Sequence, residues 1–600
     1  MNTPTLPARS ELPTNYTWEL ESVFASNAEW ESAFARASAM LPQLTAFQGR
    51  LGESAATLLA AFRLRDQAGE LLGHIAVYAH HRQDEDTANS TYQALADRTD
   101  SLAAEFGAAL SFLVPEVLAI PEETLNTWLA SEPGLDAYRH TFAEILRERP
   151  HVLDAPMEAL LAQAAELAEG PQKIFGMLNN ADLKLPNVHD EQGQEVELTQ
   201  GSYVARFLES RDRAVRREAF ETMLGAYQGV RNTMAAALST NVKRDIFYAR
   251  ARHYATAREA ALAPHNIPVS VYDALVESVR DNVPALQRYL ALRQRALGIS
   301  DLHMYDLYVP IVPEVEYKVT FEQACETVAQ ALAPLGEEYV RGLREGFTAR
   351  WIDVLENRGK RSGAYSGGAY GTRPFVLLNY QPSMDGMFTL AHEMGHSMHS
   401  YFTRRTQPYH YGDYTIFVAE VASTLNEALL THHLLETTQD RALRLYILNH
   451  YLESFRTTLY RQTLFAEFER DIHARAEAGE ALTADSLSAL YKQINDRYYG
   501  PTVDVDELIS IEWARIPHFY YNFYVYQYAT GISASAALAA RIISEGQPAV
   551  ERYLRFLRAG SSDYSINLLR DAGVDMSTPE PVRQALDTFA RYVAEMEGLL

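Results

Sequence analysis

Two histidines and a glutamate within five residues have the types and spacing to hold a metal ion and activate a water molecule. His392 and His396 lie four residues apart, and Glu393 directly follows the first histidine. On a helix this spacing places both imidazoles on one face, where they can converge on a tetrahedral zinc ion. The glutamate then projects toward a water that the metal activates, and it can take a proton from that water. The pattern predicts a zinc hydrolase, and within that class a peptidase.

The residues around this motif predict that it lies on a buried helix. Apolar side chains recur at steps of three to four residues, as an amphipathic helix requires. They are Met387, Leu390, Ala391, Met394, Met398, Tyr401 and Phe402. Asp385 and Gly386 come just before the pattern, where we expect a turn, and Pro408 prevents the helix from continuing.

A catalytic zinc ion normally takes three protein ligands, so a third ligand is expected downstream. The best candidate is Glu420, which shares one face of a second apolar helical pattern with Glu427, seven residues later. We interpret Glu420 as the third ligand and Glu427 as a residue that orients a ligating histidine. For both, the alternative is an ordinary solvated carboxylate. His399 and His410 lie nearby in the sequence and are expected to remain outside the metal site.

Several segments of the chain together resemble oligoendopeptidase F, which belongs to the thimet oligopeptidase-like family of HExxH zinc metallopeptidases. The segments that carry this resemblance are 12–20, 359–368, 392–400, 417–424 and 517–531. The resemblance implies a mainly helical, gluzincin-type enzyme with two helical lobes flanking a deep substrate channel and a small β element beside the zinc helix. It also implies one Zn²⁺ per chain and short, unstructured peptides as substrates.

A tyrosine-rich segment near residue 520 is the predicted source of hydrogen-bond donors for the substrate. The attacked carbonyl becomes an oxyanion, which phenol and imidazole groups can stabilise. The family uses a histidine and two tyrosines from this region, but its spacing carries over only with a gap. We favour His518, Tyr521 and Tyr524 as catalytic residues, with Tyr528 as an alternative. On a continuous helix these side chains would share one side, although such a stripe of aromatic residues is also typical of a core.

Residues 374–380 read as a short strand just before the metal helix. As an edge strand it could pair with an extended peptide through the backbone. The alternative is an internal hairpin strand that follows a glycine-rich loop.

Composition excludes several classes of protein. The net charge of −25 and the absence of a basic stripe argue against nucleic-acid binding. The N-terminus lacks a signal-peptide pattern, and we expect no apolar run long enough to span a membrane, so the predicted location is the cytoplasm. Cys325 is the only cysteine, so no internal disulfide can form, and a structural role is expected for it. The sequence leaves the oligomeric state open.

The rest of the chain reads as successive helices, with a hairpin expected within 183–203. The expected segments are an N-terminal helical region at 1–120, a helical segment ending in the hairpin at 121–200, and a catalytic region at 201–600. The predicted function is hydrolysis of internal bonds in short oligopeptides, with Glu393 as the general base. The alternatives are a zinc carboxypeptidase or dipeptidyl carboxypeptidase, and a peptide-binding scaffold without activity.

Overall fold

The computed structural model describes residues 6–312 and 317–600, which form two compact units. The first unit comprises Met1–Arg149, Tyr317–His433 and Leu538–Gly573, and the second comprises Pro150–Glu316, Leu434–Ala537 and Val574–Leu600. Helix accounts for 72% of the chain and strand for 2%, which confirms the mainly helical fold expected from the sequence. The segment boundaries expected near residues 120 and 200 stay a prediction.

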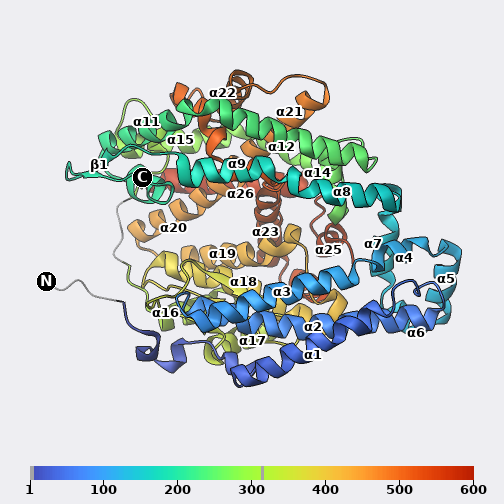
Figure 1. Ribbon diagram of the computed structural model, residues 1–600. Helices are drawn as coiled ribbons and strands as arrows, with labels where there is room; N and C mark the ends of the chain where they lie inside the picture. Colours follow the sequence, from blue (N-terminus) through green and yellow to red (C-terminus); the bar gives the residue numbers. More distant parts are fainter. Residues whose placement is uncertain (1–5, 313–316) are drawn as a thin grey trace. The chain divides into compact units, whose positions relative to one another are not determined.

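The first unit is built from three groups of helices, most of which are labelled in Figure 1, and one small sheet. The N-terminal helices are α1 (Asn27–Thr45), α2 (Ala55–Glu85), α3 (Ser90–Leu110), α4 (Leu113–Ala119), α5 (Glu122–Ser131), α6 (Pro133–Asp136) and α7 (Arg139–Arg147). The central helices are α16 (Phe321–Ala331), α17 (Glu337–Thr348), α18 (Met384–Thr406) and α19 (Ile416–Thr437), whose last residues belong to the second unit. The late helices are α24 (Gln547–Ala559) and α25 (Ser565–Asp571).

The long helix α2 connects two hydrophobic cores of the first unit. Its C-terminal half packs with α1, α3 and the sheet around buried residues such as Trp30, Tyr78 and Phe375. Its N-terminal half contributes Phe62 to a second core that also contains Phe142. Ser54 caps α2 by accepting a hydrogen bond from the backbone N–H of Thr57, which fixes where the helix begins.

The sheet of the first unit decides between the two interpretations of the strand expected at 374–380. Its strands are β3 (Ile352–Asp353), β4 (Tyr365–Gly367) and β5 (Phe375–Leu377), in the order β3-β5-β4. β5 is parallel to β3 and antiparallel to β4, so it lies in the centre. Of the two interpretations of residues 374–380, the internal hairpin strand is therefore confirmed and the edge strand is wrong. The strand at the edge toward α18 is β4, within the glycine-rich stretch.

A buried ionic cluster fixes this sheet. The Asp353 carboxylate is fully buried at the end of β3, where Lys360 Nζ lies 2.7 Å from it and Arg9 Nη2 lies 2.5 Å from it. Lys360 also donates to the backbone carbonyl of Leu355 over 2.7 Å. Because a buried carboxylate is tolerated only when it is paired, these contacts tie the N-terminal segment to the sheet.

The second unit is also mainly helical. Its helices are α8 (Ala155–Ala168), α9 (Gly170–Met177), α10 (Gln200–Ser202), α11 (Arg213–Gly229), α12 (Arg231–Ala251), α13 (Ala257–Leu262), α14 (Val269–Asp281), α15 (Val283–Leu297), α20 (Arg441–Ser454), α21 (Arg461–Glu477), α22 (Ala484–Tyr499), α23 (Tyr526–Glu545, which ends in the first unit) and α26 (Glu580–Leu599). The strands β1 (Val188–His189) and β2 (Glu195–Val196) pair antiparallel, which confirms the expected hairpin.

One stretch has the length and composition of a membrane-crossing helix, contrary to the sequence-based expectation. It is Ser90–Ala119, which reaches a mean hydropathy of 1.6 over an 18-residue window, of which 22% is buried. The stretch is not an unbroken apolar run, because Glu105, Pro115 and Glu116 interrupt it. By itself the stretch is weak evidence for a membrane span, since apolar core helices meet the same test.

Candidate metal centre

The helix α18 presents its two motif histidines side by side. It begins at Met384, where Ser383 Oγ accepts the backbone N–H of Gly386 over 3.1 Å, so the expected turn at 385–386 is instead the first turn of the helix. The rings of His392 and His396 have centroids 4.9 Å apart. The spacing of four residues therefore brings both imidazoles to one face, as predicted.

A close approach of two helices brings Glu420 to these histidines. A side chain at Gly395 would place its Cβ 2.5 Å from Ser423 Cα, so only glycine allows α19 to pass so near α18. At this crossing, Glu420 Oε2 lies 3.5 Å from His392 Nε2 and 3.6 Å from His396 Nε2. Within the described parts of the chain, these three residues form a group whose ligand atoms all lie within 4.8 Å of one another.

Glu427 lies behind the histidines. Its Oε1 is 2.7 Å from His392 Nδ1, which leaves Nε2 of that ring directed at Glu420. Asn426, the preceding residue, donates to the carbonyl of Ala391 over 3.0 Å. This hydrogen bond fixes α19 against α18 beside the motif. The contact is the one expected of a residue that orients a ligating histidine.

Burial and charge act differently on the two rings. Burial lowers the pKa of His392, but the hydrogen bond and charge of Glu427 outweigh it and raise that pKa to about 9. Burial and the neighbouring His392 lower the pKa of His396 to about 4. Glu427 therefore favours the protonated form of His392, whereas burial and the charge of His392 favour the neutral form of His396.

Glu393, which follows His392 in the motif, is buried against the edge strand. Its side chain is 7% exposed, and burial raises its pKa to about 7. The backbone N–H of Ser366 in β4 donates to its carboxylate. Ser366 Oγ also lies 2.8 Å from Ser397 Oγ, so a side-chain hydrogen bond fixes β4 against α18. Neither serine stands out in the sequence, because Ser366 lies in a glycine-rich stretch and Ser397 directly follows the second motif histidine without a distinctive spacing of its own.

The two histidines expected to remain outside the cluster have other contacts. His399 is buried and stacks on Tyr414 with ring centroids 3.6 Å apart, and burial lowers its pKa to about 3. His410 Nδ1 lies 2.9 Å from Asp66 Oδ2. Neither belongs to the group of three.

The tyrosine-rich segment lies in the second unit and is not one helix, which corrects the expectation. A 3₁₀ turn covers Pro517–Tyr520, and α23 begins only at Tyr526. Between them Asn522 and Phe523 have φ values of 47° and 58°, the left-handed region that non-glycine residues rarely adopt.

The aromatic rings of this segment still cluster. The ring of His518 lies 5.6 Å from that of Tyr521, 6.4 Å from that of Tyr524 and 6.2 Å from that of Tyr528. Burial lowers the pKa of His518, whereas Tyr521 is 46% exposed. The turn thus groups one imidazole with three phenols.

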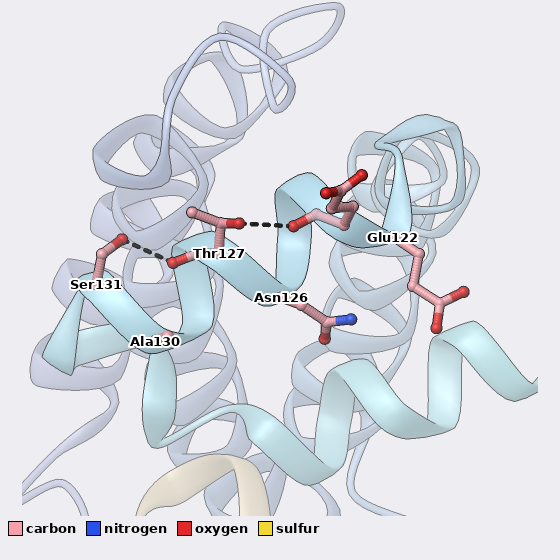
Figure 2. A pocket seen from close by; sticks show the side chains of 6 residues that line it. Glu122, Asn126, Thr127, Ala130 and Ser131 are labelled. Atoms are coloured by element: carbon pink, nitrogen blue, oxygen red, sulfur yellow. Dashed lines mark hydrogen bonds between the residues drawn. The ribbon is translucent and has the colours of Figure 1, made fainter.

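A surface hollow on α5 has no comparable chemistry. Its lining residues all lie on that one helix, and Figure 2 shows their side chains along it. Thr127 Oγ1 donates to the carbonyl of Glu123, and Ser131 Oγ donates to that of Thr127, each over 2.8 Å. These hydroxyls therefore donate hydrogen bonds to backbone carbonyls of α5 itself.

Comparison with known proteins gives matches along the whole chain. Residues 206–588 match the model of peptidase family M3, and residues 116–184 match that of oligopeptidase F. The chain is 49% identical to oligopeptidase PepF of Bacillus subtilis, over 99% of this chain and 89% of that one. It is 43% identical to group B oligopeptidase PepB of Streptococcus agalactiae, over 99% and 98% of the two chains.

Solved structures agree with these matches. The crystal structure of oligoendopeptidase-F from Enterococcus faecium aligns with a TM-score of 0.75 and 40% identity, over 96% of this chain and 99% of that one. A structure from Chlamydophila abortus aligns with a TM-score of 0.94 and 36% identity, over 99% and 100%.

Proposed function

Since this chain belongs to peptidase family M3, in the oligoendopeptidase F group, and is a metallo-endopeptidase that acts on oligopeptides, we propose that it uses one zinc ion held by His392, His396 and Glu420. The observation that carries this proposal is the convergence of their three ligand atoms within 4.8 Å. Two imidazoles and one carboxylate are a donor set that suits catalytic zinc and leaves a fourth position open.

When bound by these residues, a zinc ion would supply Lewis acidity, which would polarise the scissile carbonyl and lower the pKa of water. Glu427 holds the His392 ring through the 2.7 Å contact at Nδ1, so that Nε2 faces the metal position. His396 reaches it from the next turn of α18.

Glu393 is the proposed general base. Burial raises its pKa to about 7, and a nearby dication lowers the pKa of a carboxyl again, which favours the ionised base at neutral pH. Its carboxylate takes a proton from the attacking water and passes that proton to the leaving amine. The N–H of Ser366 holds the carboxylate in place during both transfers.

His518, Tyr521 and Tyr524 are the proposed donors to the substrate and the oxyanion. Their support is the clustering of the rings around one turn, which places several O–H and N–H donors together. Tyr528 is the alternative, because its ring lies 5.5 Å from that of Tyr524.

The edge strand β4 is the proposed docking strand for the substrate backbone. In the described sheet it pairs with β5 on one side only, and its Ser366 already contacts Glu393. An extended peptide added to this edge makes main-chain hydrogen bonds that do not depend on its side chains. Short peptides of varied sequence are therefore the expected substrates, and the cytoplasm is the proposed location.

The decisive test separates metal binding from catalysis. Glu393→Gln should retain one zinc per chain, measured by elemental analysis, and lose hydrolysis of a quenched internal peptide by about a hundredfold or more, since a general base is lost while every ligand remains. Product mapping by mass spectrometry should show internal cleavage. Normal turnover by Glu393→Gln would contradict the mechanism, and loss of zinc on replacing Glu393 would contradict the ligand assignment.

A further inference from the structure

The second unit gathers arginines that outnumber their carboxylate partners. Arg456 lies in the π-helical turn Phe455–Tyr460, Arg461 begins α21, and Arg515 ends the 3₁₀ segment Glu507–Arg515. Their side chains are 1%, 15% and 14% exposed. These three residues, which we call the arginine cluster, therefore hold their charge in a largely dry environment.

Four guanidinium groups in and beside this cluster form ion pairs with only two carboxylates. Glu453 pairs with Arg456 at 2.7 Å and with Arg293 at 3.0 Å. Glu512 pairs with Arg461 at 2.7 Å and lies 3.5 Å from Arg515. Four positive groups against two negative groups leave two positive charges in excess.

Phenols, rather than further carboxylates, fill the remaining surroundings. Apart from their carboxylate partners, Arg456 and Arg461 both interact electrostatically with Tyr308 and Tyr499. The guanidinium carbon of Arg456 lies 4.8 Å from the centroid of the Tyr308 ring, and that of Arg515 lies 5.0 Å from the Tyr203 ring. Neutral phenols can donate a hydrogen bond to an anion, but they do not cancel the excess charge.

Donor groups in the cluster also lack acceptors. Among the described residues, Arg456 Nη1 and Arg515 Nε are buried without a hydrogen-bond partner. An unsatisfied buried donor is costly, and a charged one more so. Arg461 links Arg456 to Arg515. It lies near Glu512 together with Arg515, and it interacts with Tyr308 and Tyr499 together with Arg456.

We propose that Arg456, Arg461 and Arg515, together with the Tyr308 hydroxyl, bind one small monovalent anion of the halide or carboxylate type. Such an anion accepts hydrogen bonds from the unpaired N–H groups of Arg456 and Arg515 and neutralises part of the excess positive charge. The whole chain carries −25, so general attraction of anions to its surface cannot produce the same effect. All four residues of the proposed site belong to the second unit, whereas the proposed metal ligands belong to the first.

The test is thermal unfolding of the full chain as chloride or acetate replaces a bulky sulfonate anion at constant sodium concentration. The wild type should show a saturable rise in Tm with at least one of the two anions, and the anion that gives it identifies the ligand type. Arg515→Gln and Arg456→Gln should weaken the apparent anion affinity about tenfold or more, because each removes a charge-assisted hydrogen bond.

Arg216→Gln is the matched control. Arg216 is also a buried arginine, but it is paired with Asp306 at 2.7 Å and donates to the Ser210 carbonyl over 2.7 Å. This variant should lose stability and keep the anion response. If Arg456→Gln does not fold, Arg515→Gln decides the test.

Crystals soaked in bromide provide a second measurement. An anomalous peak within hydrogen-bond distance of Arg456 Nη1 or Arg515 Nε supports the site. A wild type without saturable response to either anion, an equal response in Arg515→Gln, or a water molecule instead of bromide in the cluster would overturn the proposal.

Discussion

The Glu469 carboxyl accepts the backbone N–H of Phe523 over 2.7 Å, inside the turn that carries the tyrosine-rich segment. Glu469 is fully buried, and burial raises its pKa to about 7. Asn241 Nδ2 donates to the carbonyl of Phe519 over 3.4 Å in the same region. Because two successive left-handed residues, Asn522 and Phe523, are strained, they persist only where such contacts determine the backbone.

Glu469→Leu should therefore destabilise the protein by about 1–3 kcal/mol, since it leaves the Phe523 N–H buried without an acceptor. Glu469→Gln keeps a carbonyl oxygen at the same position and should retain most of the stability. Chemical denaturation of the two variants measures the difference. Equal stability of the Leu and Gln variants would show that the hydrogen bond does not hold the turn.

Glu427→Ala should weaken zinc affinity about 10–100-fold, because His392 loses the partner that orients its ring. Titration against a chelator of known affinity measures this change. The control is Glu436→Ala, which removes an exposed carboxylate from the same helix, α19, and should leave zinc affinity unchanged. Equal affinities in the two variants would contradict the role proposed for Glu427.

Gly395→Ala should reduce stability by about 1–3 kcal/mol, because the new methyl group meets the α19 backbone at Ser423 and forces α18 and α19 apart. Zinc affinity should fall with it, since the same crossing positions Glu420. Gly225→Ala is the control: this helical glycine has open space around it, and alanine there should stabilise slightly. Thermal unfolding and zinc titration of both variants check the prediction.

His81 should make stability depend on pH between about 6.5 and 4. Its ring is buried beside Trp18 and Phe375, and burial lowers its pKa to about 4. The unfolded chain therefore binds a proton at His81 below about pH 6.5, whereas the folded chain does so only near pH 4. The contribution of the neutral His81 ring to the free energy of unfolding is therefore fully present above pH 6.5. It is lost as the pH falls through this window, by about 3 kcal/mol in total.

His81→Phe keeps an aromatic ring in the pocket and removes the titrating group, so the variant should lose less stability than the wild type across the same window. Urea unfolding at pH 7, 5.5 and 4.5 provides the measurement. Parallel pH profiles for the wild type and His81→Phe would show that another group is responsible.

The sequence by itself determined the local part of the metal centre. His392, Glu393 and His396 lie on one short stretch of helix, so their relative positions follow from helix geometry alone. The hairpin near residue 190 and the mainly helical fold were also predicted, because the hydrophobic period is a local property. The comparisons confirm the family and the peptidase class that the motif and its neighbouring segments indicated.

Tertiary structure decided what depends on contacts between distant segments. The approach of α19 to α18 at Gly395 sets the distance of Glu420 from the histidines, and sequence spacing cannot give that distance. Packing also placed β4 rather than β5 at the sheet edge, since strand order depends on partners far along the chain. The helix expected through His518 and Tyr528 is broken because Glu469, about fifty residues earlier, stabilises a left-handed turn that local propensity disfavours.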